Sequence, residues 1–197
     1  MAQQKKGLRL TFNAPAVLVF SLACLVVLLL DYLFRDGASR LLFSVYRSSL
    51  LDPLTYVRMF GHVLGHADWS HLLGNMMYIL ILGPMLEEKY GTSNIVFLML
   101  ATALITGLIQ FIFFPGSSLL GASGIVFAMI LLSSITRNGK GDGIPVTFIL
   151  VAALYIGQQV HDAFMVQGNI SYMAHIVGGF VGAGLGFLMN HWKMSRY

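Results

Sequence analysis

Residues 90–136 read YGTSNIVFLMLATALITGLIQFIFFPGSSLLGASGIVFAMILLSSIT, and this stretch contains no charged residue. It is too long for one membrane span, which needs about 20 residues. Pro115-Gly116-Ser117-Ser118 interrupts it, and this combination of residues is typical of a loop. The stretch therefore predicts two consecutive transmembrane helices joined by a short connection.

The rest of the chain has the same character. Of the 197 residues, 57% are hydrophobic and only 10% are charged, whereas soluble domains carry about 25% charged residues. Apolar runs of this length fit helices rather than the alternating strands of a barrel. We expect an all-α membrane protein with six transmembrane helices. These predicted spans lie near 14–34, 69–86, 93–114, 120–137, 145–166 and 170–191.

One bundle of this size uses the whole chain. We expect a short cytoplasmic segment at residues 1–13, a six-helix core at 14–192 and a cytoplasmic tail at 193–197. The amino end resembles a signal peptide but lacks a small-x-small cleavage site, so the first apolar segment is interpreted as an uncleaved helix. The long first connection, residues 35–68, mixes apolar residues with arginines, as short interfacial helices do.

The basic residues predict the orientation of the chain in the membrane. They precede the first span and follow the second, fourth and sixth, whereas the connections after the third and fifth spans carry none. The first connection, with its four arginines, is the exception. Because Lys and Arg favour the cytoplasmic side, both termini are expected there.

The absence of a seventh span favours a prokaryotic plasma membrane. The charges form no stripe, so lipids rather than nucleic acid are the expected surroundings.

Gly121-Ala122-Ser123-Gly124 follows the break at 115–118. Ser123 should therefore lie in the first turn or two of the fourth span. Gly121 and Gly124 would allow other backbone to approach closely. One interpretation is a catalytic serine, and the other is a seam of small residues that packs helices together.

A lone histidine, His175, lies near the start of the sixth span, where it shares a face with Gly178 and Gly179. Ionisable groups at membrane depth are costly, about 2.5–3.5 kcal/mol on insertion scales, and are candidates for function. A buried histidine bonded to a carbonyl group is the alternative.

Three histidines and an asparagine gather around the start of the second span: His62, His66, His71 and Asn75. His71 and Asn75 are four residues apart on one helix, so both side chains point the same way. A ring N–H and an amide can stabilise an oxyanion. Zinc is the rival ligand, but the glutamate of an HExxH motif is missing, so no metal is expected.

Together these motifs resemble those of the rhomboid intramembrane serine proteases. His71-Leu72-Leu73-Gly74-Asn75, Gly121-Ala122-Ser123-Gly124 and Ala174-His175-Ile176-Val177-Gly178 look like the family's HxxxN, GxSG and AHxxG motifs, in the same order. The resemblance covers roughly residues 50–190. It implies a six-transmembrane-helix, rhomboid-like bundle.

Further positions agree with this resemblance or depart from it. Arg58 resembles the arginine of the family's Trp-Arg pair in the first connection, although Val57 stands in place of the tryptophan. His66 matches a further histidine ahead of the second helix. Phe127 occupies the position where many members have a tyrosine beneath the catalytic histidine.

The resemblance implies a serine endopeptidase without metal or cofactor. Ser123 would be the nucleophile, His175 the general base, and Asn75 and His71 the oxyanion donors. The implied substrates are transmembrane proteins, cleaved near the outer membrane boundary. Two alternatives remain: a catalytically inactive rhomboid-like protein that binds membrane proteins, and a small transporter with a histidine proton relay.

Overall fold

The computed structural model describes residues 12–34 and 37–135, together with short helical pieces between 146 and 157 and between 179 and 188. The named elements are all helices, which confirms the all-α class for the described residues. In chain order they are α1 (Pro15–Leu33), α2 (Gly37–Leu42), α3 (Pro53–Gly61), the 3₁₀-helix η1 (His62–Leu64), α4 (Trp69–Tyr90), α5 (Thr92–Phe113) and α6 (Ser123–Ile135).

Three of these helices, α1, α4 and α5, are long and apolar enough to cross a membrane. They match the first three predicted spans, and α6 is a shorter apolar helix within the fourth. The predicted spans at 145–166 and 170–191 lie largely outside the described residues. The described residues therefore support an integral membrane protein, and the count of six spans stays a prediction.

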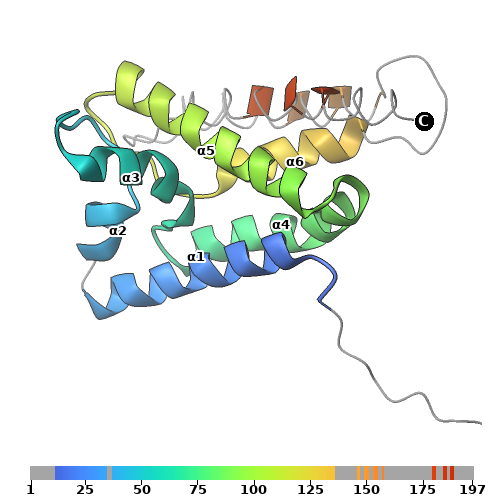
Figure 1. Cartoon of the computed structure of the whole chain (residues 1–197), viewed down its shortest axis with the longest axis horizontal. Helices are drawn as coiled ribbons and strands as arrows, with labels where there is room; N and C mark the ends of the chain where they lie inside the picture. Colours follow the sequence, from blue (N-terminus) through green and yellow to red (C-terminus); the bar gives the residue numbers. More distant parts are fainter. Residues whose placement is uncertain are drawn as a thin grey trace, which may run out of the picture.

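The four longer helices enclose one apolar core. α1 and α4 lie side by side and antiparallel, while α5 crosses above them and α6 lies behind α5 (Figure 1). α4 packs against α1 and also against α6. The core between them is formed by completely buried side chains, among them Val17, Ile79, Leu98 and Met129. The start of α6, where Ser123 lies, is thus fixed by helices on more than one side.

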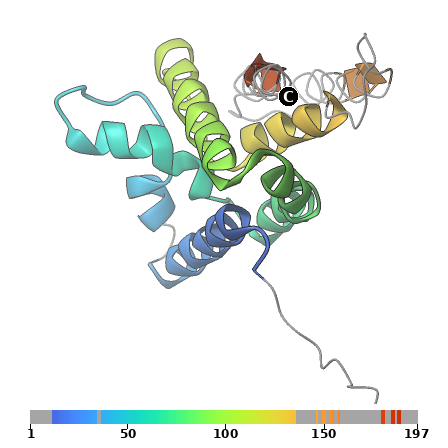
Figure 2. The same cartoon turned by 45° about the vertical axis from the view of Figure 1, so that its right-hand side comes forward.

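The first connection contains three short helices, α2, α3 and η1. α2 and α3 project sideways from the long helices (Figure 2). Asp52 caps α3, because its Oδ1 accepts the N–H of Leu54 at 3.0 Å. α3 then packs against α5 and leads through η1 to the start of α4. The connection therefore ends beside the predicted histidine cluster.

Candidate functional site

Ser123 is the first residue of α6. Its Oγ atom is buried and has no hydrogen-bond partner among the residues that the structure describes. Leaving a buried hydroxyl without a partner costs about 1–3 kcal/mol, so such groups call for an explanation. This serine is not part of an ordinary hydrogen-bonded helix cap within the described structure.

Gly121 brings the loop between α5 and α6, residues 114–122 and called the serine loop below, against the predicted oxyanion residues. Its φ is +120°, a conformation that side chains disfavour. A Cβ atom there would lie 2.6 Å from Nε2 of His71 and 3.8 Å from Nδ2 of Asn75. The two side chains therefore face the backbone just ahead of Ser123. The sequence had suggested a close approach of backbone, but at Gly121 the approaching groups are side chains.

His71 presents an N–H to this loop. Its Nδ1 accepts a hydrogen bond from the backbone N–H of Ala67 at 3.4 Å. In the neutral ring the proton must then lie on Nε2. That nitrogen is the one that faces Gly121. The local fold is set by Asp68, whose Oδ1 caps α4 by accepting the N–H of His71 at 2.8 Å.

Asn75 lies one turn further along α4, and its side chain is 7% exposed. Its Nδ2 is a buried donor with no partner within the described part of the chain. Two polar groups without a partner in the described part of the chain, Asn75 Nδ2 and Ser123 Oγ, thus flank the same glycine-containing loop. A carbonyl oxygen placed between them would satisfy the amide donor.

α6 packs closely on its neighbours just below Ser123. A Cβ atom on Gly124 would lie 3.3 Å from Cγ2 of Thr106 and 3.5 Å from Cγ2 of Thr102. Phe127, one turn further along, is 1% exposed. A Cβ atom on Gly179 would overlap the Phe127 ring. A helical piece from the carboxyl-terminal part of the chain therefore lies directly against α6.

Two predicted site residues, His175 and Gly178, lie outside the described residues. The predicted pairing of Ser123 with His175 therefore stays a prediction.

His66 adjoins this cluster from the loop that precedes α4. Its ring meets that of His71 edge-on, with the centroids 5.0 Å apart. It is completely buried, and Nε2 has no partner among the described residues. Burial, followed by the nearby charge of His71, lowers the pKa of His66 from 6.5 to about 4. The ring is therefore neutral near pH 7.

Arg58 stabilises the first connection. Its Nε donates to the Leu41 carbonyl at 2.8 Å and its Nη1 pairs with Asp52 at 3.1 Å. The guanidinium also lies over the Tyr46 ring, 4.8 Å from the centroid. Val57, at the position of the family's tryptophan, is 48% exposed. Arg58 thus anchors the connection without that residue.

Sequence reasoning missed the residues that fix the serine loop. Val45 and Leu119 exchange both backbone hydrogen bonds at 2.9 Å, and the N–H of Gly121 donates to the His62 carbonyl at 2.9 Å. A single bridge of this kind leaves no alternating pattern in the sequence. The loop that leads to Ser123 is consequently tied to the first connection and to η1.

Gln110 fixes the other end of the loop. Its Nε2 donates to the carbonyls of Phe114 and Ser117 at 3.3 and 3.1 Å. Here the sequence did contain a signal. Thr102, Thr106 and Gln110 recur every four residues in an otherwise apolar helix, and all three are buried. Such a polar stripe indicates a face that is turned inward, where its side chains can find hydrogen-bond partners.

Near this site the described histidines do not converge on one point. His62 Nε2 lies 3.1 Å from Thr106 Oγ1, whereas the rings of His66 and His71 meet edge-on. Among the described residues no group of three or more His, Cys, Asp or Glu side chains could hold a metal ion. The described groups are a serine hydroxyl, an amide donor and an imidazole donor. Such a combination suits acyl transfer.

This combination defines a helical membrane protein with a buried serine beside oxyanion-type donors. The model of the Rhomboid domain matches residues 53–192. The match covers more than half of the chain and includes the serine loop and all of the histidines discussed above. The chain therefore belongs to the rhomboid family.

Three relatives show how far the similarity extends. The chain is 32% identical over 158 residues to Rhomboid-related protein 2 of Mus musculus, covering 70% of this chain and 52% of that protein. It is 28% identical over 182 residues to Rhomboid protease GlpG of Salmonella paratyphi A, covering 88% of this chain and 63% of that protein. It is 24% identical over 139 residues to the chloroplastic Rhomboid-like protein 11 of Arabidopsis thaliana, covering 64% of this chain and 49% of that protein. The chain thus spans about half to three-fifths of these relatives.

Proposed function

We propose that this protein is an intramembrane serine endopeptidase of the rhomboid type. The observation that carries the proposal is the buried Oγ of Ser123, which has no hydrogen-bond partner among the described residues and follows the loop that His71 and Asn75 face across Gly121. In this mechanism Ser123 attacks a peptide carbonyl, and Asn75, His71 and the backbone N–H of Ser123 stabilise the oxyanion. One relative, the Salmonella protein, is named a protease.

His175 is the proposed general base. Support comes from the contact between Gly179 and Phe127. Gly179 follows His175 by four residues, and Phe127 follows Ser123 by four. If the fourth and sixth spans cross the membrane in the same direction, one helical turn back from this contact brings the serine and the histidine together. The histidine would take the serine proton and later protonate the leaving amine.

A labelling experiment tests the dyad. The full chain in detergent is treated with a fluorophosphonate probe, which reacts with activated serines. Wild-type protein should be labelled. Ser133→Ala is the control and should be labelled too, because Ser133 lies on the same helix and bonds only to the Ile130 carbonyl among the described residues. Ser123→Ala and His175→Ala should not be labelled. Equal labelling of His175→Ala and wild type would remove the histidine from the mechanism.

The substrates proposed are transmembrane proteins, cut near the outer boundary of the membrane. A model transmembrane substrate should be cleaved by the wild type and by Ser133→Ala, and left intact by Ser123→Ala. Binding of that substrate without cleavage or labelling would instead identify an inactive member that holds membrane proteins. Orientation is tested separately, by labelling introduced cysteines from each side of the membrane, with both termini expected in the cytoplasm.

A further inference from the structure

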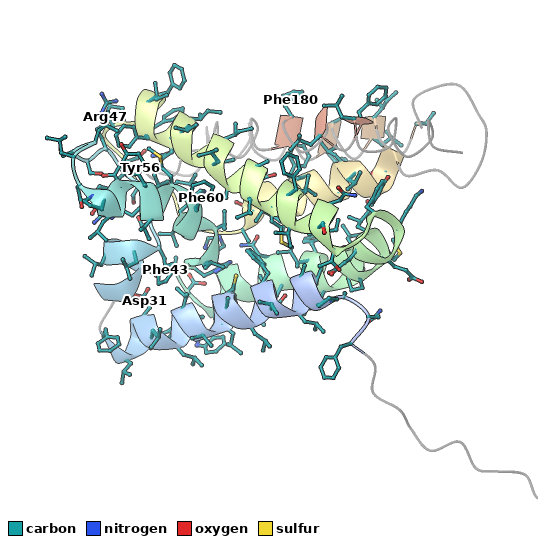
Figure 3. All side chains as sticks on the ribbon, viewed as in Figure 1. Asp31, Phe43, Arg47, Tyr56, Phe60 and Phe180 are labelled. Carbon is teal, nitrogen blue, oxygen red and sulfur yellow. The ribbon has the colours of Figure 1, made fainter. Side chains whose placement is uncertain are left out.

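A second polar feature lies beside the candidate catalytic cluster. It is a cavity of about 670 Å³ between the end of α1, the first connection and the serine loop, and Asp31, Ser39, Ser44, His66, Ser118 and Leu120 are among its lining residues. Ligand pockets are typically about 300–1,000 Å³. Asp31 reaches it from the last turn of α1 (Figure 3).

The cavity adjoins the proposed oxyanion donors at two points. Leu120 lines it and directly precedes Gly121, the residue that His71 and Asn75 face. His66 also lines it, and its ring contacts that of His71. A peptide whose carbonyl group reached Ser123 could therefore place a nearby side chain in this cavity.

The backbone bridge between Val45 and Leu119 gives the cavity its polar character. Val45 and Leu119 are buried in an apolar cluster with Met59 and Phe111. Neighbouring side chains of an extended segment point to opposite faces. Ser44 and Ser118, which precede the bridged residues, line the cavity instead. Apolar contacts thus stabilise one face of the bridge, and hydroxyl groups cover the other.

Two buried polar atoms of the lining have no hydrogen-bond partner within the described ranges. Ser39 Oγ and His66 Nε2 have none among the described residues, and the two side chains are 7% and 0% exposed. Nδ1 of His66 lies 3.1 Å from the Leu64 carbonyl oxygen and so carries the proton. In the neutral ring Nε2 is then an acceptor. The lowered pKa of His66, about 4, keeps the ring neutral near pH 7.

Asp31 adds a carboxylate to these acceptors. It is 6% exposed, and its Oδ1 accepts the backbone N–H of Ser39 at 2.8 Å. Arg47, which also lines the cavity, is engaged elsewhere, because its Nη1 donates to the Phe111 carbonyl at 3.1 Å and its guanidinium lies over the Phe111 ring. The described lining therefore combines a carboxylate with the two atoms that lack a partner there, and the Nη1 donor of Arg47 is used outside the cavity.

We propose that this cavity is a substrate subsite for a cationic side chain, lysine or arginine, located near the cleaved bond. The inference rests on the proposed protease function and adds a specificity to it. An ammonium or guanidinium group would donate to the Asp31 carboxylate, to Nε2 of His66 and to Ser39 Oγ. A charge-assisted hydrogen bond contributes about 1.5–3 kcal/mol, which corresponds to at least about tenfold in kcat/KM or in affinity.

The test uses matched substrates in detergent. Lysine and its uncharged analogue norleucine are placed in turn at each residue flanking the cleavage site of a model transmembrane substrate. At one position lysine should raise kcat/KM about tenfold. Asp31→Asn, which keeps the acceptor for the Ser39 N–H, should reduce this ratio to near one, and Ser39→Ala should reduce it partly. Glu88→Gln, an exposed carboxylate near the end of α4, should leave the ratio unchanged.

A binding measurement keeps the two proposals distinguishable. Fluorescent lysine and norleucine peptides are titrated against Ser123→Ala, with and without Asp31→Asn, and followed by anisotropy. A lysine preference that depends on Asp31 supports the subsite even if wild-type protein cleaves nothing, in which case the protease proposal fails alone. Equal binding and equal cleavage of both peptides at every position would overturn the subsite.

Discussion

The Cα atom of Gly121 lies between the backbone turn that precedes Ser123 and the side chains of His71 and Asn75. Two separate constraints act on it. Its φ of +120° is unfavourable for a residue with a side chain. A methyl group would also displace His71, because the added carbon would lie 2.7 Å from Cε1. The residue is therefore required for the site rather than for the helix that follows.

Gly121→Ala tests this requirement. We expect the rate of cleavage to fall about 10²-fold, as for the loss of one oxyanion donor, while the protein stays folded. Gly74→Ala is the matched control, because a Cβ atom on Gly74 meets nothing within 4 Å. Probe labelling and a thermal midpoint in detergent are measured for both. Full activity in Gly121→Ala would show that His71 does not need its observed position.

His66 predicts a pH dependence of stability. Its pKa is lowered from 6.5 to about 4 by burial and by His71, opposed by the Leu64 carbonyl and Asp68. Between these values the unfolded chain binds a proton that the folded protein does not. The free energy of unfolding should therefore decrease as the pH falls from 6.5 to 4, by up to about 3 kcal/mol.

The comparison is with His66→Gln, which removes the titrating ring. Thermal midpoints of both proteins are measured in detergent from pH 7.5 to pH 4. The gap between the two curves should change across this range, with the wild type losing more stability on acidification. Parallel curves would mean that His66 takes up its proton as easily in the folded protein as in the unfolded chain.

At the scale of the helices, Glu87 joins the end of α4 to the start of α1. Its Oε1 and Oε2 accept the N–H groups of Ala16 and Val17, both at 3.0 Å, and Thr92 Oγ1 donates to Oε1 at 2.8 Å. The first N–H groups of a helix have no partner within the helix. The Glu87 carboxylate supplies the missing acceptor for these N–H groups, and it also interacts favourably with the helix dipole.

Glu87→Ala should therefore be strongly destabilising. It leaves two N–H groups of α1 without a partner in a site where the carboxylate is 3% exposed, at about 1–3 kcal/mol for each group. Glu88→Ala, an exposed neighbour, should change the thermal midpoint in detergent little. Similar midpoints for the two variants would show that water replaces the carboxylate at the end of α1.

This cap also explains where the sequence prediction of α4 fell short. The apolar pattern predicted a helix over 69–86, whereas α4 continues to Tyr90. Hydropathy treats Glu87 as an exposed charge that ends a span, but the residue is buried against α1. The predicted spans at 14–34 and 93–114 agree closely with α1 and α5, since in both a long apolar run coincides with the helix.

Only part of the candidate site could be predicted, because a sequence shows helical periodicity but not contacts between distant loops. Helical periodicity was enough to place His71 and Asn75 on one face of α4, and the loop break placed Ser123 at the start of α6. The bridge between Val45 and Leu119 depends on a contact between distant loops. The cavity beside it depends on how those loops fold. Neither leaves a periodic signal, so both required the structure.

At the scale of the whole molecule, the proposed site needs the carboxyl-terminal part of the chain to lie against α6. Gly179 contacts the Phe127 ring so closely that a Cβ atom would overlap it. Gly179→Ala should push its segment away from α6. The rate of cleavage should then fall, because the proposed dyad, Ser123 and His175, lies one helical turn before Phe127 and Gly179. Gly184→Ala is the control, since a Cβ atom there meets nothing within 4 Å.

A double-mutant cycle separates this effect from a general loss of stability. Phe127→Ala alone leaves a void in the core and should destabilise the protein by about 3–5 kcal/mol. When Phe127→Ala is combined with Gly179→Ala, the methyl group added on the glycine would occupy part of that void. Activity and thermal midpoint should then both be higher than the two single effects predict when added. Additive effects would place Phe127 and Gly179 out of contact in the active protein, and the proposed pairing of Ser123 with His175 would lose its support.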